Sequence, residues 1–125
     1  MLTSIVITVT PLQQMTGPAF VGRAVQAWLL SRISAVDAGF AERLHQGDGL
    51  RPYTVSDLVG VGPIRAGQRL LSPERSGWLR VTSLTPELSA LLLERVVPAL
   101  PGAQIDLGGP LVRVDGVATQ AAEHP

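Results

Sequence analysis

The chain has 125 residues, of which ten are basic and ten acidic, so its formal net charge is zero. This length fits one domain around one hydrophobic core. The neutral balance excludes the overall basic excess that is typical of many nucleic-acid-binding domains, so any such binding must be local. All ten basic residues are arginine. We interpret this as the coding bias of a GC-rich genome. It also means that only fork-shaped guanidinium donors are offered to anions.

Cysteine is absent, which excludes a disulfide framework, a thiol nucleophile and a cysteine-based zinc site. The apolar start from Met1 to Thr10 alternates like a strand and lacks a basic leader, so we do not interpret it as a signal peptide. No apolar run approaches the roughly 20 residues that cross a bilayer. We therefore expect a cytoplasmic protein without a membrane partner.

The first half of the chain predicts one strand and two helices. Ser4 to Thr10 alternates with the period of a strand. After a loop, apolar residues at helical spacing predict a helix over about 18–33, with Thr16 as its cap. Its stripe comprises Phe20, Val21, Ala24, Val25, Trp28 and Leu29. Ser34 and Asp37, in capping-box-like spacing, predict a second short helix that ends at His45.

The second half predicts three strands and one helix. Strands are expected over 51–61 and 77–84, with a long loop over 62–76 between them. Thr85-Pro86-Glu87 is typical of a helix start. The following helix buries Leu88, Leu91, Leu92 and Val96 and stops near Pro98. A last strand region runs over 103–117, with a bulge or turn at Gly108-Gly109-Pro110.

This order, β-α-(α)-β-β-α-β, predicts an α+β, ferredoxin-like fold, in which an antiparallel sheet carries helices on one face and leaves the other face open. Trp78, Arg80 and Thr82 share one side of the third strand. On an open face, the tryptophan and arginine could stack RNA bases. A tryptophan in this position also packs against other domains, and that interpretation stays open.

The segment from Leu44 to Ser56 contains the internal histidine, His45, and beyond it Arg51 at the start of a strand. A histidine titrates near neutrality and can transfer a proton, whereas a guanidinium stays charged and can hold a phosphate by paired hydrogen bonds. A helix C-terminus favours the protonated imidazole, which suits a general acid. The alternative is that His45 is a helix-end residue and Arg51 a solvated charge.

The run from Gly22 to Leu58 resembles the N-terminal half of CRISPR-associated protein 6, an endoribonuclease of the RAMP superfamily that cuts precursor CRISPR RNA. The resemblance lies in Ala41-Glu42-Arg43-Leu44-His45 followed by Arg51-Pro52-Tyr53-Thr54-Val55-Ser56. It implies cleavage without metal or cofactor, in which a 2′-hydroxyl attacks the adjacent phosphate and leaves a 2′,3′-cyclic phosphate. His45 corresponds to the family's catalytic histidine and Arg51 to its basic residue, which is usually lysine.

Two departures accompany the resemblance. Some members carry a tyrosine in the first helix, where this chain has Ser31 and Arg32, and Arg32 is counted here as an RNA-binding candidate beside Trp78 and Arg80. The family also has a second ferredoxin-like domain with a glycine-rich loop, for which Gly108-Gly109-Pro110 is too short. We therefore expect residues 1–118 to form the N-terminal domain and 119–125 a linker or frayed tail.

The resemblance implies CRISPR repeat RNA as the substrate, with a second ferredoxin-like domain and CRISPR effector proteins as further partners. A different class of function is also consistent with the sequence, namely a non-catalytic scaffold domain that binds RNA or protein through its open sheet face. A small-molecule-binding domain is disfavoured because no phosphate-loop or metal-binding motif is present.

Overall fold

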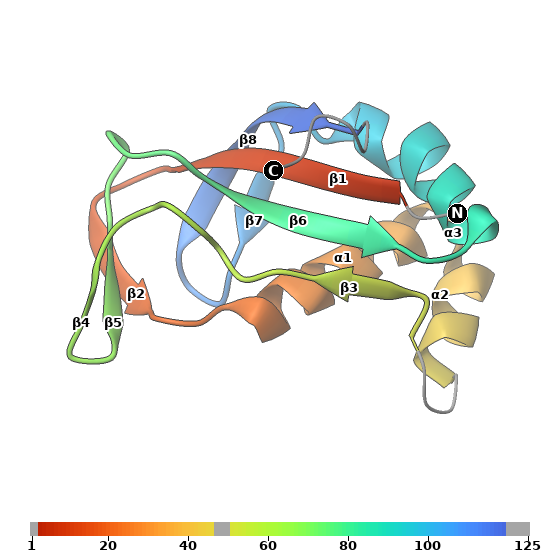
Figure 1. Ribbon diagram of the computed structural model, residues 1–125, viewed down its shortest axis with the longest axis horizontal. Coiled ribbons are helices and arrows are strands. Elements are labelled where there is room, and N and C mark those ends of the chain that lie inside the picture. Colours follow the sequence, from red (N-terminus) through yellow and green to blue (C-terminus); the bar gives the residue numbers. More distant parts are fainter. Residues whose placement is uncertain (1–2, 47–50, 120–125) are drawn as a thin grey trace.

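A computed structural model describes residues 3–46 and 51–119, and for His45 and Gln46 it describes the backbone alone. Its main element is a five-stranded antiparallel sheet in the order β3-β6-β1-β8-β7 (Figure 1). The strands are β1 (Thr3–Pro11), β3 (Tyr53–Val55), β6 (Gly77–Ser83), β7 (Gln104–Asp106) and β8 (Leu111–Ala118). Without the edge strand β7, the order is that of a ferredoxin-like sheet, with the first strand between the third and the fourth. The predicted fold class is confirmed.

The helices cover one face of this sheet. They comprise α1 (Gly22–Val36), α2 (Ala38–Gln46), α3 (Pro86–Leu91), the π-helical segment Leu92–Val96 and the 3-10 turn Val97–Ala99. On α1, Val25, Leu29 and Ile33 are almost completely buried, and they belong to the same core as Ile5 and Ile7 of β1. In the part of the chain that the structure describes, the opposite face of the sheet carries no helix. Among the described residues, no helix has the length and apolar character needed to cross a membrane.

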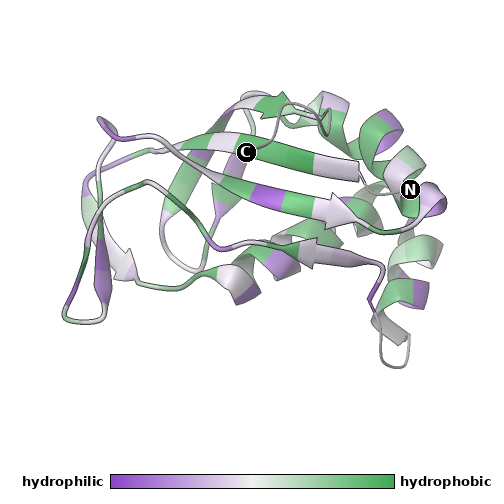
Figure 2. Cartoon of the chain, viewed as in Figure 1, coloured by the Kyte–Doolittle hydropathy of each residue, from purple (hydrophilic) through white to green (hydrophobic). Residues whose placement is uncertain are grey.

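A second, three-stranded sheet forms where loops were expected, before the first helix and over 62–76. It consists of β2 (Met15–Pro18), β5 (Gln68–Leu71) and β4 (Ile64–Arg65), paired in that order. Ala66 and Gly67 form the turn between β4 and β5 with φ angles of 53° and 75°, as a two-residue hairpin of the I′ type requires. Figure 2 shows hydrophilic residues in β5, whereas Leu71 at the end of this strand is buried and belongs to the core.

The start of α1 also differs from expectation. The helix begins at Gly22, four residues later than predicted, and Thr16 lies in β2 instead of at the cap. Val21 occupies the cap position without a side-chain hydrogen bond of its own. Phe20, expected in the buried stripe, precedes the helix and is 75% exposed. The capping group is the carboxylate of Asp57, which accepts hydrogen bonds from the backbone N–H groups of Val21 and Gly22.

The boundary between α1 and α2 lies at Asp37. Ser34 belongs to α1, which continues to Val36, so the expected capping box does not form. Instead, the Asp37 side chain accepts a hydrogen bond from Phe40 N at 2.9 Å, and its own N–H donates to Ile33 O at the end of α1. Asp37 therefore closes one helix and opens the next, as a short polar cap residue can. The expected contact of Phe40 and Leu44 with the core is present, because both pack against it.

The strand expected over 51–61 is interrupted. Tyr53–Val55 pairs with β6, and Val59 resumes the pairing opposite Trp78. Between these points three residues, 56–58, face only two on β6, which makes this a β-bulge. Ser56 fills the gap, since its hydroxyl accepts Arg80 N at 2.7 Å and donates to Asp57 O at 2.8 Å. The bulge turns Asp57 towards the start of α1.

The last third of the chain follows the prediction closely. Thr85 caps α3 by accepting Leu88 N at 3.3 Å, and Leu88, Leu91, Leu92 and Val96 are buried as expected. Beyond Leu91 the helix continues as a π-helical segment and then as a 3-10 turn before it ends. Pro98 lies in this last turn and has no N–H to donate. Gly108 and Gly109 form a turn whose N–H groups both donate to Asp106 Oδ1.

Candidate nucleic-acid interface

Trp78 and Arg80 lie on the face of the sheet opposite the described helices. On β6, Gly77, Leu79, Val81 and Ser83 are buried, whereas the alternating residues Trp78, Arg80 and Thr82 are half-buried. The Arg80 guanidinium carbon lies 5.5 Å from the centre of the Trp78 ring, within range of a cation–π interaction. The expected alternation along this strand is therefore present. We call the side of the sheet that bears these three residues the open face.

The neighbouring strands extend the open face on both sides. Thr8 and Val6 of β1 pair with Trp78 and Arg80, and these four residues line a shallow cavity of about 150 Å³. On the other side, exposed Thr54 of β3 pairs with Thr82. An indole ring, a guanidinium and hydroxyl groups thus lie in one surface layer. Such a surface can stack a base and donate hydrogen bonds to a phosphate.

His45 lies in the last turn of α2, as expected. Its side chain is outside the described residues, and so is the connection 47–50 that leads to Arg51. The structure therefore gives no relation between the imidazole and the guanidinium. The pairing of these two side chains stays a prediction.

Arg51 is exposed and lies two residues before the start of β3. Its positive charge acts on Tyr53, which is 5% exposed and packs in the core. Burial raises the pKa of the Tyr53 phenol above its ordinary value, and the charge of Arg51 opposes this rise in pKa. The Arg51 guanidinium is thus accessible to solvent and also lowers the pKa of a phenol in the core.

A cavity of about 600 Å³ lies where α2, the start of β3 and the start of α3 meet. Phe40, Arg43 and Leu44 of α2 line it together with Pro52 and residues 85–87. The Arg43 guanidinium carbon lies 5.2 Å from the centre of the Phe40 ring. Arg43 is a cation that sequence reasoning missed as a site candidate. Its spacing of three residues from Phe40 on a helix was the available signal.

Arg32 is not brought together with Trp78 and Arg80. It is exposed on α1, and its guanidinium lies 3.5 Å from the Ser31 hydroxyl. Because α1 covers the other face of the sheet, a strand of RNA would have to pass around an edge to contact all three residues. Within the described part of the chain, no cluster of three or more potential metal-binding side chains is present.

Solved structures with this fold include a Cas6 protein in a product complex, with a TM-score of 0.71 and 23% identity over 100% of this chain and 43% of that one. A RAMP protein that binds different RNA substrates has a TM-score of 0.73 and 15% identity over 94% of this chain and 48% of that one. A Cas6-related protein from Pyrococcus furiosus has a TM-score of 0.75 and 15% identity over 96% and 48%, respectively.

The chain has the fold of the Cas6 and RAMP proteins. The resemblance to CRISPR-associated protein 6 found in the sequence is thereby confirmed at the level of the fold. This chain spans less than half the length of these matching structures. No protein-family model matches the chain, and no curated protein matches it in sequence.

Proposed function

We propose that this chain is the N-terminal ferredoxin-like domain of an endoribonuclease that cleaves CRISPR repeat RNA. The observation that carries the proposal is the fold shared with Cas6 structures along the chain, together with the motif of Leu44-His45 at the end of α2 and Arg51 shortly before β3. The Trp78 and Arg80 pair on the open face supports RNA binding independently of that motif.

The reaction is a transesterification within one strand. The 2′-hydroxyl of a ribose loses its proton to a general base and attacks the adjacent phosphorus, and the bond to the 5′-oxygen breaks. A general acid protonates this leaving oxygen, so the products are a 2′,3′-cyclic phosphate and a 5′-hydroxyl. His45 is assigned as the general acid or base. Arg51 stabilises the negative charge that builds up on the phosphate oxygens.

Substrate, partners and assembly follow from the same proposal. The substrate is a CRISPR repeat RNA. A second ferredoxin-like domain would complete the RNA-binding surface, and CRISPR effector proteins would receive the product. The second candidate function is a non-catalytic scaffold that holds RNA through the open face. Trp78 and Arg80 favour this alternative, because their stacking geometry does not depend on His45.

A cleavage assay on repeat RNA separates the two functions. The full-length gene product and the 125-residue chain are each incubated with the RNA in the presence of chelator, and the ends are tested for a 2′,3′-cyclic phosphate. His45→Ala is expected to abolish cleavage while RNA affinity is unchanged, whereas His124→Ala, at the other histidine of the chain, leaves cleavage intact. RNA binding without cleavage by either protein would establish the scaffold function instead.

A further inference from the structure

The cavity of about 600 Å³ between α2 and the start of α3 has been given no role so far. We call it the helix pocket. Its lining comes from one face of α2, from Pro52 and from residues 85–87. Leu44, in this lining, immediately precedes His45, and Pro52 immediately follows Arg51. The pocket is therefore bordered by both segments that carry the residues assigned to the reaction.

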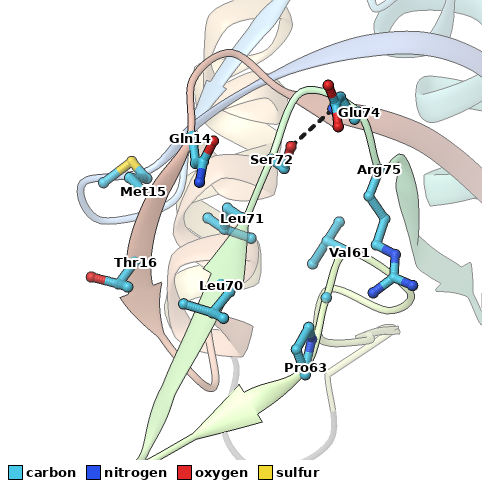
Figure 3. A pocket seen from close by; sticks show the side chains of 11 residues that line it. Gln14, Met15, Thr16, Val61, Pro63, Leu70, Leu71, Ser72, Glu74 and Arg75 are labelled. Atoms are coloured by element: carbon cyan, nitrogen blue, oxygen red, sulfur yellow. Dashed lines mark hydrogen bonds between the residues drawn. The ribbon is translucent and has the colours of Figure 1, made fainter.

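A cavity of similar volume, about 610 Å³, lies on the second sheet (Figure 3). Its lining holds Glu74 beside Arg75, so its charge favours neither an anion nor a cation. None of the residues that line it is adjacent in sequence to His45 or Arg51. Of these two cavities, the helix pocket is thus the one that the proposed reaction brings next to RNA.

Both walls of the helix pocket are held in place by the fold. Leu84 N donates to Pro52 O at 2.8 Å, which ties the chain before α3 to the chain before β3. Thr85, as the cap of α3, fixes the first turn of that helix. On the other wall, Phe40 and Leu44 of α2 pack against the core. A pocket that is formed in advance costs less conformational entropy when a ligand binds.

The lining combines apolar surface with one charge of each sign. The apolar surface comes from Phe40, Leu44, Pro52 and Pro86. The charged residues are Arg43 on α2 and Glu87 on α3, both exposed. Within the described residues, they do not form an ion pair with each other. Because the two charges cancel, the pocket does not select a phosphate. It suits a neutral, flat ring with hydrogen-bonding edges, as a nucleobase is.

The two charged side chains offer different contacts to such a ring. The Arg43 guanidinium carbon lies 5.2 Å from the centre of the Phe40 ring, and a guanidinium plane or an aromatic ring can stack a base. An ionised carboxylate only accepts hydrogen bonds. In the described part of the chain, the Glu87 carboxylate has no hydrogen-bond or ion-pair partner. It can therefore accept from the exocyclic amino group that adenine, cytosine and guanine carry.

We propose that the helix pocket holds the base of a nucleotide adjoining the scissile phosphate, stacked on Arg43 and Phe40, with its amino group donating to Glu87. The inference rests on the proposed function, because that function places the scissile phosphate at His45 and Arg51. It makes Glu87 a specificity-determining residue. Uracil has no amino group, and the two carbonyl oxygens beside its N–H group are repelled by a carboxylate.

Removal of single bases next to the cut tests the pocket. The full-length gene product cleaves CRISPR repeat RNA in the presence of chelator, with an abasic ribose placed on one side or the other of the scissile phosphate. Loss of the base that occupies the pocket is expected to slow cleavage about tenfold, as the loss of one stacked base does. Loss of the base on the other side should have a smaller effect. Unchanged cleavage in both cases, or a natural repeat with uracil on both sides of the cut, would overturn the proposal.

Glu87→Gln tests the selection of the base. The base at the sensitive position is replaced by uracil, which should slow cleavage by the unmodified protein about tenfold, since a hydrogen bond is lost and a carbonyl oxygen faces the carboxylate. An amide both donates and accepts, so in Glu87→Gln this difference should fall to about twofold. The matched control Glu94→Gln, at an exposed position of the segment Leu92–Val96, should keep the full difference. Both RNAs are compared on the same protein, so a loss of stability does not imitate the result.

Binding provides a readout that does not depend on cleavage. The intact and the abasic RNA, each with hydrogen in place of the attacking 2′-hydroxyl, are bound to the full-length gene product and followed by anisotropy. Arg43→Gln should reduce the affinity difference between these two RNAs, because the base and the guanidinium contact each other. Arg95→Gln, at another exposed arginine, should leave the difference unchanged. Equal behaviour of the two variants would contradict stacking on Arg43.

The two proposals fail in different ways. Cleavage that is insensitive to the bases beside the cut and to Glu87→Gln would mean that the helix pocket holds no base, while the proposed function stands. Absence of cleavage by the full-length gene product would overturn both proposals.

Discussion

The carboxylate of Asp57 accepts a hydrogen bond from the backbone N–H of Val21 at 3.0 Å, across 36 residues of chain. The same carboxylate accepts Gly22 N at 3.2 Å and Leu58 N at 2.8 Å. A helix start leaves N–H groups without partners, and this side chain satisfies them from a neighbouring strand. The start of α1 is therefore held by β3 and its bulge, not by a residue next to the helix.

Removing this carboxylate should destabilise the fold. We expect Asp57→Ala to lower the free energy of unfolding by about 1–2 kcal/mol, in line with the loss of a helix cap, and Asp57→Asn to have a smaller effect because the amide oxygen still accepts. Urea denaturation measures the difference. Glu94→Ala, at an exposed acidic residue of the helical segment, serves as control, and an equal loss in that variant would contradict the capping role.

Tyr53 is the only tyrosine of the chain, so its titration can be followed by the absorbance of the phenolate. Its pKa is raised above 10.0 by burial, while the charge of Arg51 lowers it. Arg51→Gln should therefore raise the titration midpoint of Tyr53 further. A midpoint that does not change in this variant would show that Arg51 does not act on the phenol.

The same pKa shift links stability to alkaline pH. The unfolded chain ionises Tyr53 near 10.0 and the folded chain only at higher pH, so the stability from the neutral buried phenol is present below pH 10 and is lost as pH rises through the folded pKa. Tyr53→Phe should thus lose less stability than the unmodified chain between pH 9 and pH 11. Chemical denaturation at the two pH values provides the comparison.

Gly77 has no room for a side chain. A Cβ atom there would overlap the Val59 carbonyl oxygen and a methyl group of Val61. We expect Gly77→Ala to break the pairing of Val59 with Trp78 and to cost at least about 2 kcal/mol of stability. Gly116→Ala is the matched control, because it lies in β8 with nothing within 4 Å of its Cβ position. Thermal unfolding of both variants should separate them clearly.

Trp78 should carry a large part of the RNA affinity. Loss of one stacked base costs about 1–3 kcal/mol in single-strand binders, so Trp78→Leu is expected to weaken binding about tenfold. Phe20→Ala removes another aromatic residue that is 75% exposed but lies before α1, and it should leave the affinity unchanged. Equal effects in the two variants, measured by anisotropy, would contradict a specific stacking role for Trp78.

The strands and helices that were predicted from the sequence are those with a clear apolar period. β1, β6 and α3 with its Thr85 cap are examples, and the buried residues predicted for the helical stretch that begins with α3 are confirmed. The β4–β5 hairpin was missed because its turn has Ala66 at a position with positive φ, where Asn, Asp or Gly is the usual signal. The cap of α1 was misplaced because Asp57 is distant in sequence and no local pattern reveals it.

Of the candidate site, only the arrangement of residues along one strand could be predicted from the sequence. The common side of Trp78, Arg80 and Thr82 follows from the period of a strand alone, and the structure contains it. Arg32 was grouped with these residues by resemblance, but it lies on a helix across the sheet. A cavity of the second sheet, lined by residues of 14–16, 61–63 and 70–75, could not be anticipated, since only the folded sheet brings these three segments together.

The sheet order also has a consequence for how the chain reaches its native state. β1 pairs with β6 on one side and with β8 on the other, so its second hydrogen-bonding edge stays open until residues 111–118 are available. Pairings this distant in sequence close large loops and slow folding. During synthesis, therefore, one edge of β1 stays unpaired until residues 111–118 have been translated. In that interval, this free edge is where misassembly between nascent chains would begin.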